Sequence, residues 1–237
     1  MSDLKTEYVQ LGDIRLAYCQ NGNGRDLLLL HGNSGSKEFF KAYQLEHFPE
    51  FHTIAIDSRG HGKSRSKDKS LTYEQQSIDI LEFCRARNIR NASLIGYSDG
   101  GNLALWLAIK APDLFDKVVT LSPNTKAGGT TEGAMRAIQK AVKMMTWISK
   151  VYPPMNKNLM RFRLMLSDSG IEYEMLKTIQ SKVLMLYAGK DMITEEHILE
   201  IVHHIPNVVV TKIEKASHLS LPFNDEAIQT MQQFLAV

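Results

Sequence analysis

Hydrophobic and polar positions follow two different periods along this chain. Near its start, Thr6–Leu11 and Ile14–Cys19 alternate apolar with polar residues, and Gly12-Asp13 joins them. A period of two on both sides of a tight turn predicts a hairpin of antiparallel strands. Because only one face of each strand is apolar, we expect this hairpin at the edge of a sheet.

The remaining strand candidates are continuously or mostly apolar and are bounded by turn residues. Such runs are typical of strands buried on both faces. Helical periodicity appears between them and after the last one. The alternation of strand and helix predicts βαβ crossovers and a mostly parallel sheet. The apolar runs are Asp26–Leu30, Phe51–Ile56, Ala92–Ile95, Lys117–Leu121, Val183–Tyr187 and Val208–Ile213.

The alternation stops between residues 125 and 180, where we find no convincing strand pattern. Gly128-Gly129 gives a flexible entry, Tyr152-Pro153-Pro154 separates two helical stretches, and Lys and Arg are in excess. We expect residues 1–124 and 181–237 to form a core domain, with residues 125–180 inserted as a helical cap over the strand ends. Methionine side chains adapt to apolar ligands of different shapes, but we expect most of them to fill space between the cap helices. We expect the basic residues to form a solvated face. Seven of the eleven methionines lie here: Met135, Met144, Met145, Met155, Met160, Met165 and Met175.

The overall composition is that of a globular protein with a sizeable core, at 43% hydrophobic residues. Its net charge of +2 argues against nucleic acid as a partner. The first residues lack the pattern of a signal peptide, and no apolar stretch approaches the roughly 20 residues that span a bilayer. Cys19 and Cys84 have no motif spacing, so we expect free, half-buried thiols in a reducing compartment. The pattern predicts a cytoplasmic protein without membrane insertion and leaves its oligomeric state open.

A nucleophile candidate lies where a buried strand turns directly into a helix. Gly96-Tyr97-Ser98-Asp99-Gly100 fits Gly-x-Ser-x-Gly, between the strand Ala92–Ile95 and a helical run at Leu103–Ala108. So tight a turn forces Ser98 into strained backbone angles, and the glycines remove Cβ atoms that would collide. The serine hydroxyl is then presented beside a helix N-terminus, where negative charge is favoured.

Two glycine-bearing loops follow neighbouring strands. His31-Gly32-Asn33-Ser34-Gly35 comes after the first buried strand, and its backbone N–H groups could stabilise an oxyanion, with Asn33 the expected donor. We expect His31 to hold the loop rather than to act as a base. The loop Asp57–Ser64 lacks the spacing of a phosphate-binding loop. There we expect Asp57 and Arg59 to brace the turn.

A serine nucleophile needs a base, and the base needs an orienting carboxylate. Asp191 follows one late strand and His218 follows the next. If both strands extend the parallel sheet beyond the Ser98 strand, the three side chains meet at one edge. The order Ser98, Asp191, His218 is the one expected for this arrangement. We find no His/Cys cluster with zinc spacing, so we predict no metal and no cofactor.

Together these motifs resemble the α/β-hydrolase fold superfamily over nearly the whole chain. The resemblance implies an α/β protein with about eight mostly parallel strands flanked by helices and a cap after the sixth. It also implies Ser98, Asp191 and His218 as a catalytic triad, and Asn33 and Asp99 as donors of oxyanion-hole N–H groups. One departure is Ser217, where a glycine often precedes the histidine. The motifs are His31-Gly32-Asn33, Asp57-x-Arg59-Gly60-x-Gly62-x-Ser64, Gly96-Tyr97-Ser98-Asp99-Gly100-Gly101, Gly189-Lys190-Asp191 and Ser217-His218.

The resemblance implies a hydrolase that cleaves a carboxylic ester of a small or medium acyl substrate through an acyl-enzyme on Ser98. The same triad serves C–C bond hydrolases, aminopeptidases and lyases, which fold-level similarity does not separate. A ligand-binding module that retains the fold is an alternative of a different class. Asp99 has two interpretations: a carboxylate that stabilises a helix start, or one that recognises a substrate amine, as in similar amino-acid ester hydrolases of the valacyclovir hydrolase type.

Overall fold

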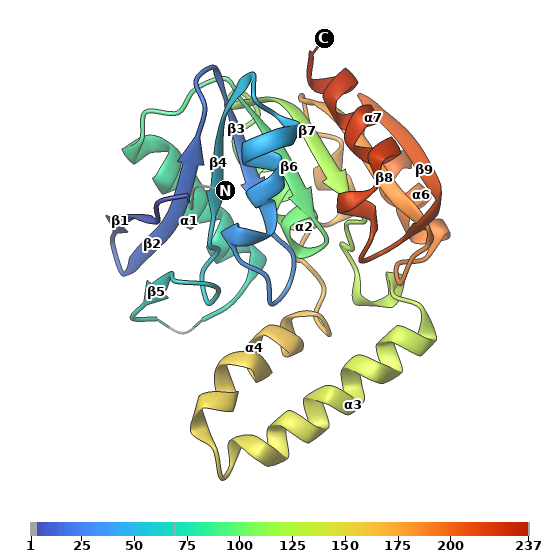
Figure 1. Ribbon diagram of the computed structural model, residues 1–237. Coiled ribbons are helices and arrows are strands. Elements are labelled where there is room, and N and C mark those ends of the chain that lie inside the picture. Colours follow the sequence, from blue (N-terminus) through green and yellow to red (C-terminus); the bar gives the residue numbers. More distant parts are fainter. Residues whose placement is uncertain (1–3, 69, 237) are drawn as a thin grey trace.

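The structure, a computed structural model, describes residues 4–68 and 70–236. Within these residues it contains one sheet with helices on both faces, as predicted (Figure 1). Eight strands follow one another in the order β1-β2-β4-β3-β6-β7-β8-β9, and β5 pairs with β2. The strands are β1 (Glu7–Leu11), β2 (Ile14–Asn21), β3 (Arg25–Leu30), β4 (Phe51–Ile56), β5 (Arg65–Ser66), β6 (Ala92–Tyr97), β7 (Phe115–Leu121), β8 (Lys182–Lys190) and β9 (Val208–Ser217).

The strand directions agree with the pattern of the sequence. β1 pairs antiparallel with β2, and β2 antiparallel with β4, so the predicted edge hairpin is confirmed. The pairs from β4 through β3, β6, β7 and β8 to β9 are all parallel. All eight predicted strands are present. The ninth, β5, was not predicted because two residues are too short to show a period.

Two layers of helices cover the sheet, and the parallel strands supply apolar side chains to both. Leu28 and Leu30 belong to the core that includes α1 (Tyr73–Ala86), α2 (Asp99–Lys110), α5 (Tyr173–Leu176) and α6 (Glu195–His203). Leu27 and Leu29 belong to the core on the other face. That core includes the short helices η1 (Lys37–Phe40) and η2 (Tyr43–His47), and α7 (Asp225–Ala236). Burial on both faces is the reason why β3 has no polar period.

Both cysteines are free thiols, as predicted, but they are more deeply buried than expected. Cys19 lies in one core and Cys84 in the other, each 1% exposed. Burial raises the pKa of Cys19 to about 11 and that of Cys84 to about 12. Because the thiolate is the reactive form, neither side chain is suited to act as a nucleophile.

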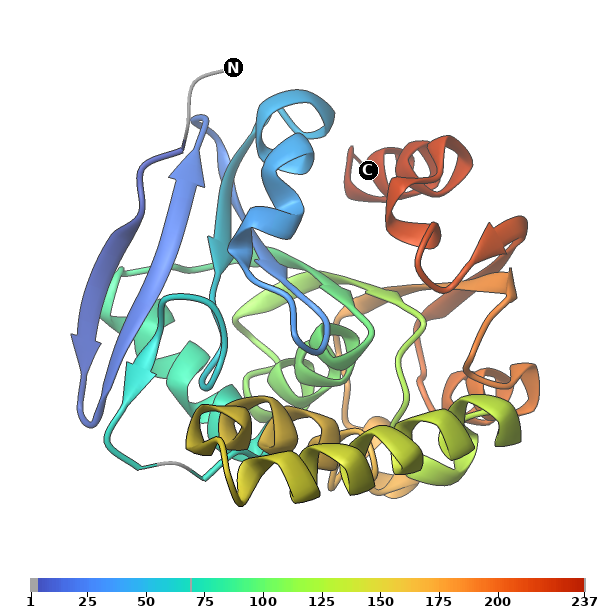
Figure 2. The same ribbon diagram turned by 60° about the horizontal axis from the view of Figure 1, so that its bottom comes forward.

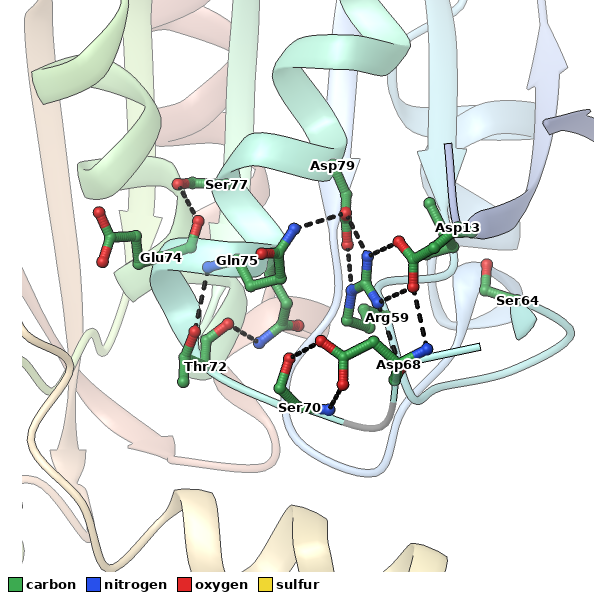
Figure 3. A network of polar contacts seen from close by, with 12 residues as sticks. Asp13, Arg59, Ser64, Asp68, Ser70, Thr72, Glu74, Gln75, Ser77 and Asp79 are labelled. Atoms are coloured by element: carbon green, nitrogen blue, oxygen red, sulfur yellow. Dashed lines mark hydrogen bonds and ion pairs between the residues drawn. The ribbon is translucent and has the colours of Figure 1, made fainter. Parts of the chain in front are cut away.

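The loop after β4 is held by a buried arginine. The Arg59 guanidinium, 2% exposed, donates to both carboxylate oxygens of Asp79 in α1 at 2.7 Å. Its two terminal nitrogens, Nη2 and Nη1, donate to Asp13 in the β1–β2 turn at 2.8 and 2.9 Å (Figure 3). Asp57, also buried, accepts the backbone N–H groups of Lys37 in η1 and of Lys63 in its own loop. The prediction that Asp57 and Arg59 brace this turn is therefore confirmed.

Helices fill the chain between β7 and β8. They are η3 (Ala127–Gly129), α3 (Glu132–Ser149), η4 (Pro153–Met155) and α4 (Asn156–Leu164), followed by α5. An isolated bridge between Thr130 and Ile193 is the one β contact that the described residues form in this segment. Figures 1 and 2 both show α3 and α4 as a hairpin beyond the end of the sheet where α2 begins. In the described part of the chain, no helix is long and apolar enough to cross a membrane.

Candidate active site

Ser98 lies on the sharp turn between β6 and α2, as the motif predicts. Its φ and ψ are 53° and −116°, a conformation that L-residues rarely adopt. The flanking glycines make this turn possible: a Cβ on Gly96 would lie 2.1 Å from the Gly100 carbonyl oxygen. A Cβ on Gly100 would lie 2.0 Å from the Leu30 carbonyl oxygen at the end of β3. The start of α2 therefore packs directly on the neighbouring strand, which holds the serine at the edge of the sheet.

The structure brings Ser98, His218 and Asp191 together in one hydrogen-bonded series. His218 Nε2 lies 3.1 Å from Ser98 Oγ, and His218 Nδ1 lies 2.7 Å from Asp191 Oδ1. Asp191 follows β8 and His218 follows β9, so two adjacent parallel strands deliver the pair to the serine. Because a carboxylate can only accept, Nδ1 carries the ring proton and Nε2 is left to accept the serine hydroxyl.

Asp191 is held as a carboxylate by donors around it. Its oxygens accept the backbone N–H groups of Ala188 at 3.1 Å and Ile193 at 3.0 Å, and the Ser122 hydroxyl. Burial acts to raise the pKa of Asp191, but the hydrogen bonds and the charge of His218 outweigh it, so this pKa lies below its ordinary value. Ser122 was missed in the sequence. Its one signal is its position directly after β7, at the same edge as Ser98.

Aromatic contacts orient the loop that carries His218. The Tyr97 hydroxyl, from the residue before the serine, donates to the His218 carbonyl at 3.1 Å. The two rings lie 5.3 Å apart, and Phe39 stacks on the other side of Tyr97 at 5.2 Å. The residue that precedes Ser98 therefore also positions the loop that carries His218.

Asn33 and Asp99, the predicted backbone donors, lie next to each other at the serine. The Asn33 side-chain amide donates to Asp99 Oδ2 at 2.8 Å. A Cβ on Gly32 would come within 3.2 Å of the Ser98 Cβ, so the loop after β3 reaches Ser98 directly. In the described part of the chain, the backbone N–H of Asn33 donates no hydrogen bond. The backbone N–H of Asp99 lies in the first turn of α2, where no described carbonyl accepts it. Both remain free to meet a ligand.

The side chain of Asp99 is partly exposed beside Ser98. It forms no ion pair with a Lys or Arg among the described residues. Its hydrogen bonds come from the Asn33 amide and the Tyr73 hydroxyl. Burial raises the pKa of Asp99 above its ordinary value, against the opposing effect of these two donors. A carboxylate in this position would gain from a nearby cation.

Arg161, from α4, joins the inserted helices to this site, whereas the basic residues of this segment were expected to form a solvated face. Its guanidinium donates to the Gly60 carbonyl at 2.9 and 2.6 Å. Its own carbonyl accepts the Asn33 side-chain amide at 2.8 Å. One residue of α4 therefore contacts both the loop after β4 and the loop after β3. No local pattern marks it, since its partners lie about 100 residues away in the chain.

His31 holds its loop, as expected, and His61 in the next loop is also structural. The Ser58 backbone N–H donates to His31 Nε2 at 3.2 Å, so Nδ1 is protonated and donates to the Gly32 carbonyl at 2.8 Å. The His61 ring bonds the Arg59 carbonyl. Burial lowers the pKa of His31, and lowers that of His61 to about 3. Both rings therefore stay neutral, and neither contacts Ser98.

A cavity of about 550 Å³ opens between the start of α1 and the end of α4. Tyr73, Trp106 and Leu164 lie among its lining residues, whereas Ser98, Asp191 and His218 do not. Tyr73, one of these lining residues, also hydrogen-bonds Asp99. No cluster of three or more His, Cys, Asp or Glu side chains suited to a metal ion occurs within residues 4–68 and 70–236.

Comparisons with known proteins agree with the fold. A family model described as alpha/beta hydrolase fold matches residues 27–146. Serine hydrolase BPHL from Homo sapiens is 27% identical over 252 aligned residues, which cover 96% of this chain and 85% of that protein.

Solved structures of low sequence identity share the fold. E-2-(acetamidomethylene)succinate hydrolase aligns with a TM-score of 0.80 at 19% identity, over 99% of this chain and 100% of its own. The enol-lactonase from Burkholderia xenovorans aligns with a TM-score of 0.78, also at 19% identity, over 98% of this chain and 100% of its own. With half of its length matched by the family model and its sheet shared with these enzymes, the chain belongs to the α/β hydrolase fold family.

Proposed function

We propose that this protein is a serine hydrolase that cleaves a carboxylic ester of a small or medium acyl substrate. The observation that carries the proposal is the series from Ser98 Oγ through the His218 ring to the Asp191 carboxylate, with contacts of 3.1 and 2.7 Å. Three side chains from distant parts of the chain form it, at the edge where a βαβ sheet binds ligands. In this role Ser98, Asp191 and His218 act as a catalytic triad.

The proposed reaction proceeds through an acyl-enzyme. His218 Nε2 takes the Ser98 proton while Ser98 Oγ attacks the substrate carbonyl. His218 then protonates the leaving alcohol, and water releases the acid in a second attack in which His218 is again the base. Asp191 holds the ring in the required tautomer and stabilises its cationic form.

The backbone N–H groups of Asn33 and Asp99 are proposed as the oxyanion hole. Their support is the contact between the loop after β3 and Ser98, and the absence of other acceptors for these groups in the described residues. Preorganised N–H donors stabilise the charge that develops on the attacked oxygen. We further propose that residues 125–180 serve as a cap over this site, since Arg161 of α4 bonds the loop that carries Asn33.

The same three side chains could also cleave bonds other than carboxylic esters. Relatives of this fold include an enzyme named 2-(acetamidomethylene)succinate hydrolase and a meta-cleavage product hydrolase. A C–C bond hydrolase or an aminopeptidase would use the same three side chains. Esters are favoured here because ester cleavage requires only a nucleophile, a base with its orienting carboxylate and backbone donors for the oxyanion, and all four are proposed at this site.

Covalent labelling tests the proposal that the protein is an enzyme. A fluorophosphonate probe phosphonylates a serine whose hydroxyl is activated by a histidine, so we expect stoichiometric labelling at Ser98, located by peptide mass spectrometry. Heat-denatured protein serves as the control and should remain unlabelled. Folded protein that stays unlabelled would instead indicate a ligand-binding module. A panel of p-nitrophenyl esters of rising chain length then defines the acyl group.

A second candidate, hydrolysis of α-amino acid esters, is favoured by the environment of Asp99. Its carboxylate lies next to the nucleophile, is partly exposed and has no Lys or Arg partner in the described part of the chain. The ammonium group of an α-amino ester bound at Ser98 would supply the missing cation. Charge-assisted hydrogen bonds of this kind are roughly twice as strong as neutral ones.

Asp99→Asn separates the two interpretations of this side chain, because it removes the charge and keeps the backbone N–H. If Asp99 recognises an amine, the ratio of kcat/KM for an α-amino ester to that for its deaminated analogue should fall by about 10- to 100-fold. The measurement compares both substrates with the wild-type protein and the variant. An unchanged ratio would leave Asp99 as a helix-start carboxylate that contributes about 0.3–1 kcal/mol.

A further inference from the structure

The outer face of α3 combines large apolar side chains with lysines, which is unusual for a solvated helix. Trp147 is 69% exposed and Val151, just beyond the helix, is 77% exposed. Lys140, Lys143, Met144, Trp147 and Val151 each lie three or four residues from another member of the set, so they share one face. α3 packs on α4 and η4 with its other side. Tyr152, in the turn to η4, extends the exposed apolar surface.

The charge of this region differs from that of the rest of the chain. Residues 126–163 hold eight Lys or Arg side chains and one acidic residue, Glu132, whereas the whole chain has a net charge of only +2. Some of these cations have partners: Arg136 forms an ion pair with Glu132, and Arg161 donates to the Gly60 carbonyl. Lys140, Lys143 and Lys150 are exposed and form no ion pair among the described residues. Lys143 and Lys150 lie one helical turn before and after Trp147, and Lys140 lies two turns before it.

We propose that the outer face of α3 and the turn after it bind the surface of an anionic lipid bilayer. Aromatic and aliphatic side chains would enter the headgroup region, and the unpaired lysines would contact anionic headgroups. Figure 1 shows the hairpin of α3 and α4 projecting away from the sheet, so a flat surface can approach it. A second copy of the chain would fit this face less well than an anionic bilayer. Two such faces in contact would bring the same lysines together, and like charges repel.

Trp147 provides a direct reporter of this contact. The protein has two tryptophans, and the other, Trp106, is 5% exposed in the core. Mixing the protein with vesicles of phosphatidylcholine and phosphatidylglycerol should shift the tryptophan emission to shorter wavelength. Vesicles of phosphatidylcholine alone should give a much smaller shift. Trp147→Phe leaves only Trp106, and in that variant the shift should be absent.

Charge variants test the electrostatic part of the proposal. The triple variant Lys140→Gln, Lys143→Gln, Lys150→Gln should lower the partition coefficient on the anionic vesicles by about 100-fold, measured by co-sedimentation. A matched control replaces three exposed lysines of the sheet domain, Lys67, Lys182 and Lys215, with Gln and changes the net charge equally. It should bind nearly as well as the wild-type protein. Thermal unfolding checks that both variants are folded.

Two outcomes would overturn the proposal. Equal loss of binding in both triple variants would mean that net charge, not this face, attracts the vesicles. No binding of the wild-type protein, combined with a concentration-dependent dimer that Trp147→Phe abolishes in sedimentation velocity, would assign the face to a second copy of the chain.

Discussion

Ser98→Ala should lower kcat/KM for the best p-nitrophenyl ester by about 10⁴-fold or more. The reason is chemical: alanine leaves the oxyanion donors and the binding surface in place but removes the atom that attacks. The residual rate would come from water acting in the same site. Steady-state kinetics with active-site titration of the wild-type protein gives the ratio.

The effect of this change on folding should be small. The Ser98 hydroxyl contacts His218 Nε2, and alanine can adopt the same backbone angles about as well as serine. Thermal unfolding of Ser98→Ala should therefore match that of the wild-type protein. Ser167→Ala, which removes an exposed hydroxyl elsewhere, is the matched control and should keep full activity. Ester turnover by Ser98→Ala within tenfold of the wild-type rate would refute the proposed nucleophile.

Gly100→Ala should cost about 3 kcal/mol or more of unfolding free energy and abolish activity. The added Cβ would lie 2.0 Å from the Leu30 carbonyl oxygen and 2.8 Å from that of His31. Both obstacles are backbone at the end of a buried strand, so no side-chain rotation relieves them. Either α2 moves away from β3, or the loop that carries Asn33 is displaced. Urea unfolding followed by circular dichroism measures the loss.

Gly133→Ala is the matched control for this prediction. Gly133 lies in α3, and a Cβ there meets nothing within 4 Å. Because alanine favours helix over glycine by about 1 kcal/mol, this variant should be as stable as the wild-type protein or more stable. Unfolding of Gly100→Ala and Gly133→Ala at the same urea concentration would contradict the close packing of α2 on β3.

Much of the fold was determined by local patterns in the sequence. The sheet strands could be predicted because burial on both faces of a parallel sheet leaves a continuous apolar run, and burial on one face leaves an alternating one. The turn at Ser98 could be predicted because only glycine fits where a strand and a helix meet so closely. Strand order along the chain then placed Asp191 and His218 at the same edge as Ser98.

Contacts between distant residues were decided by the tertiary structure alone. Ser122 bonds Asp191, and Arg161 bonds Gly60 and Asn33, without any motif that marks them. Such pairs depend on strand register and side-chain rotamers across about 70 to 130 residues of chain, and a local period carries no information about either.

The outer face of α3 shows the same division. The sequence by itself determined that this segment is helical, basic and rich in methionine, since these are properties of composition and spacing. It did not determine which side of the helix meets α4 and which side meets solvent, because apolar residues occur on both. The orientation of the helix was decided by its packing in the tertiary structure, in which Ile138 is buried and Trp147 is exposed.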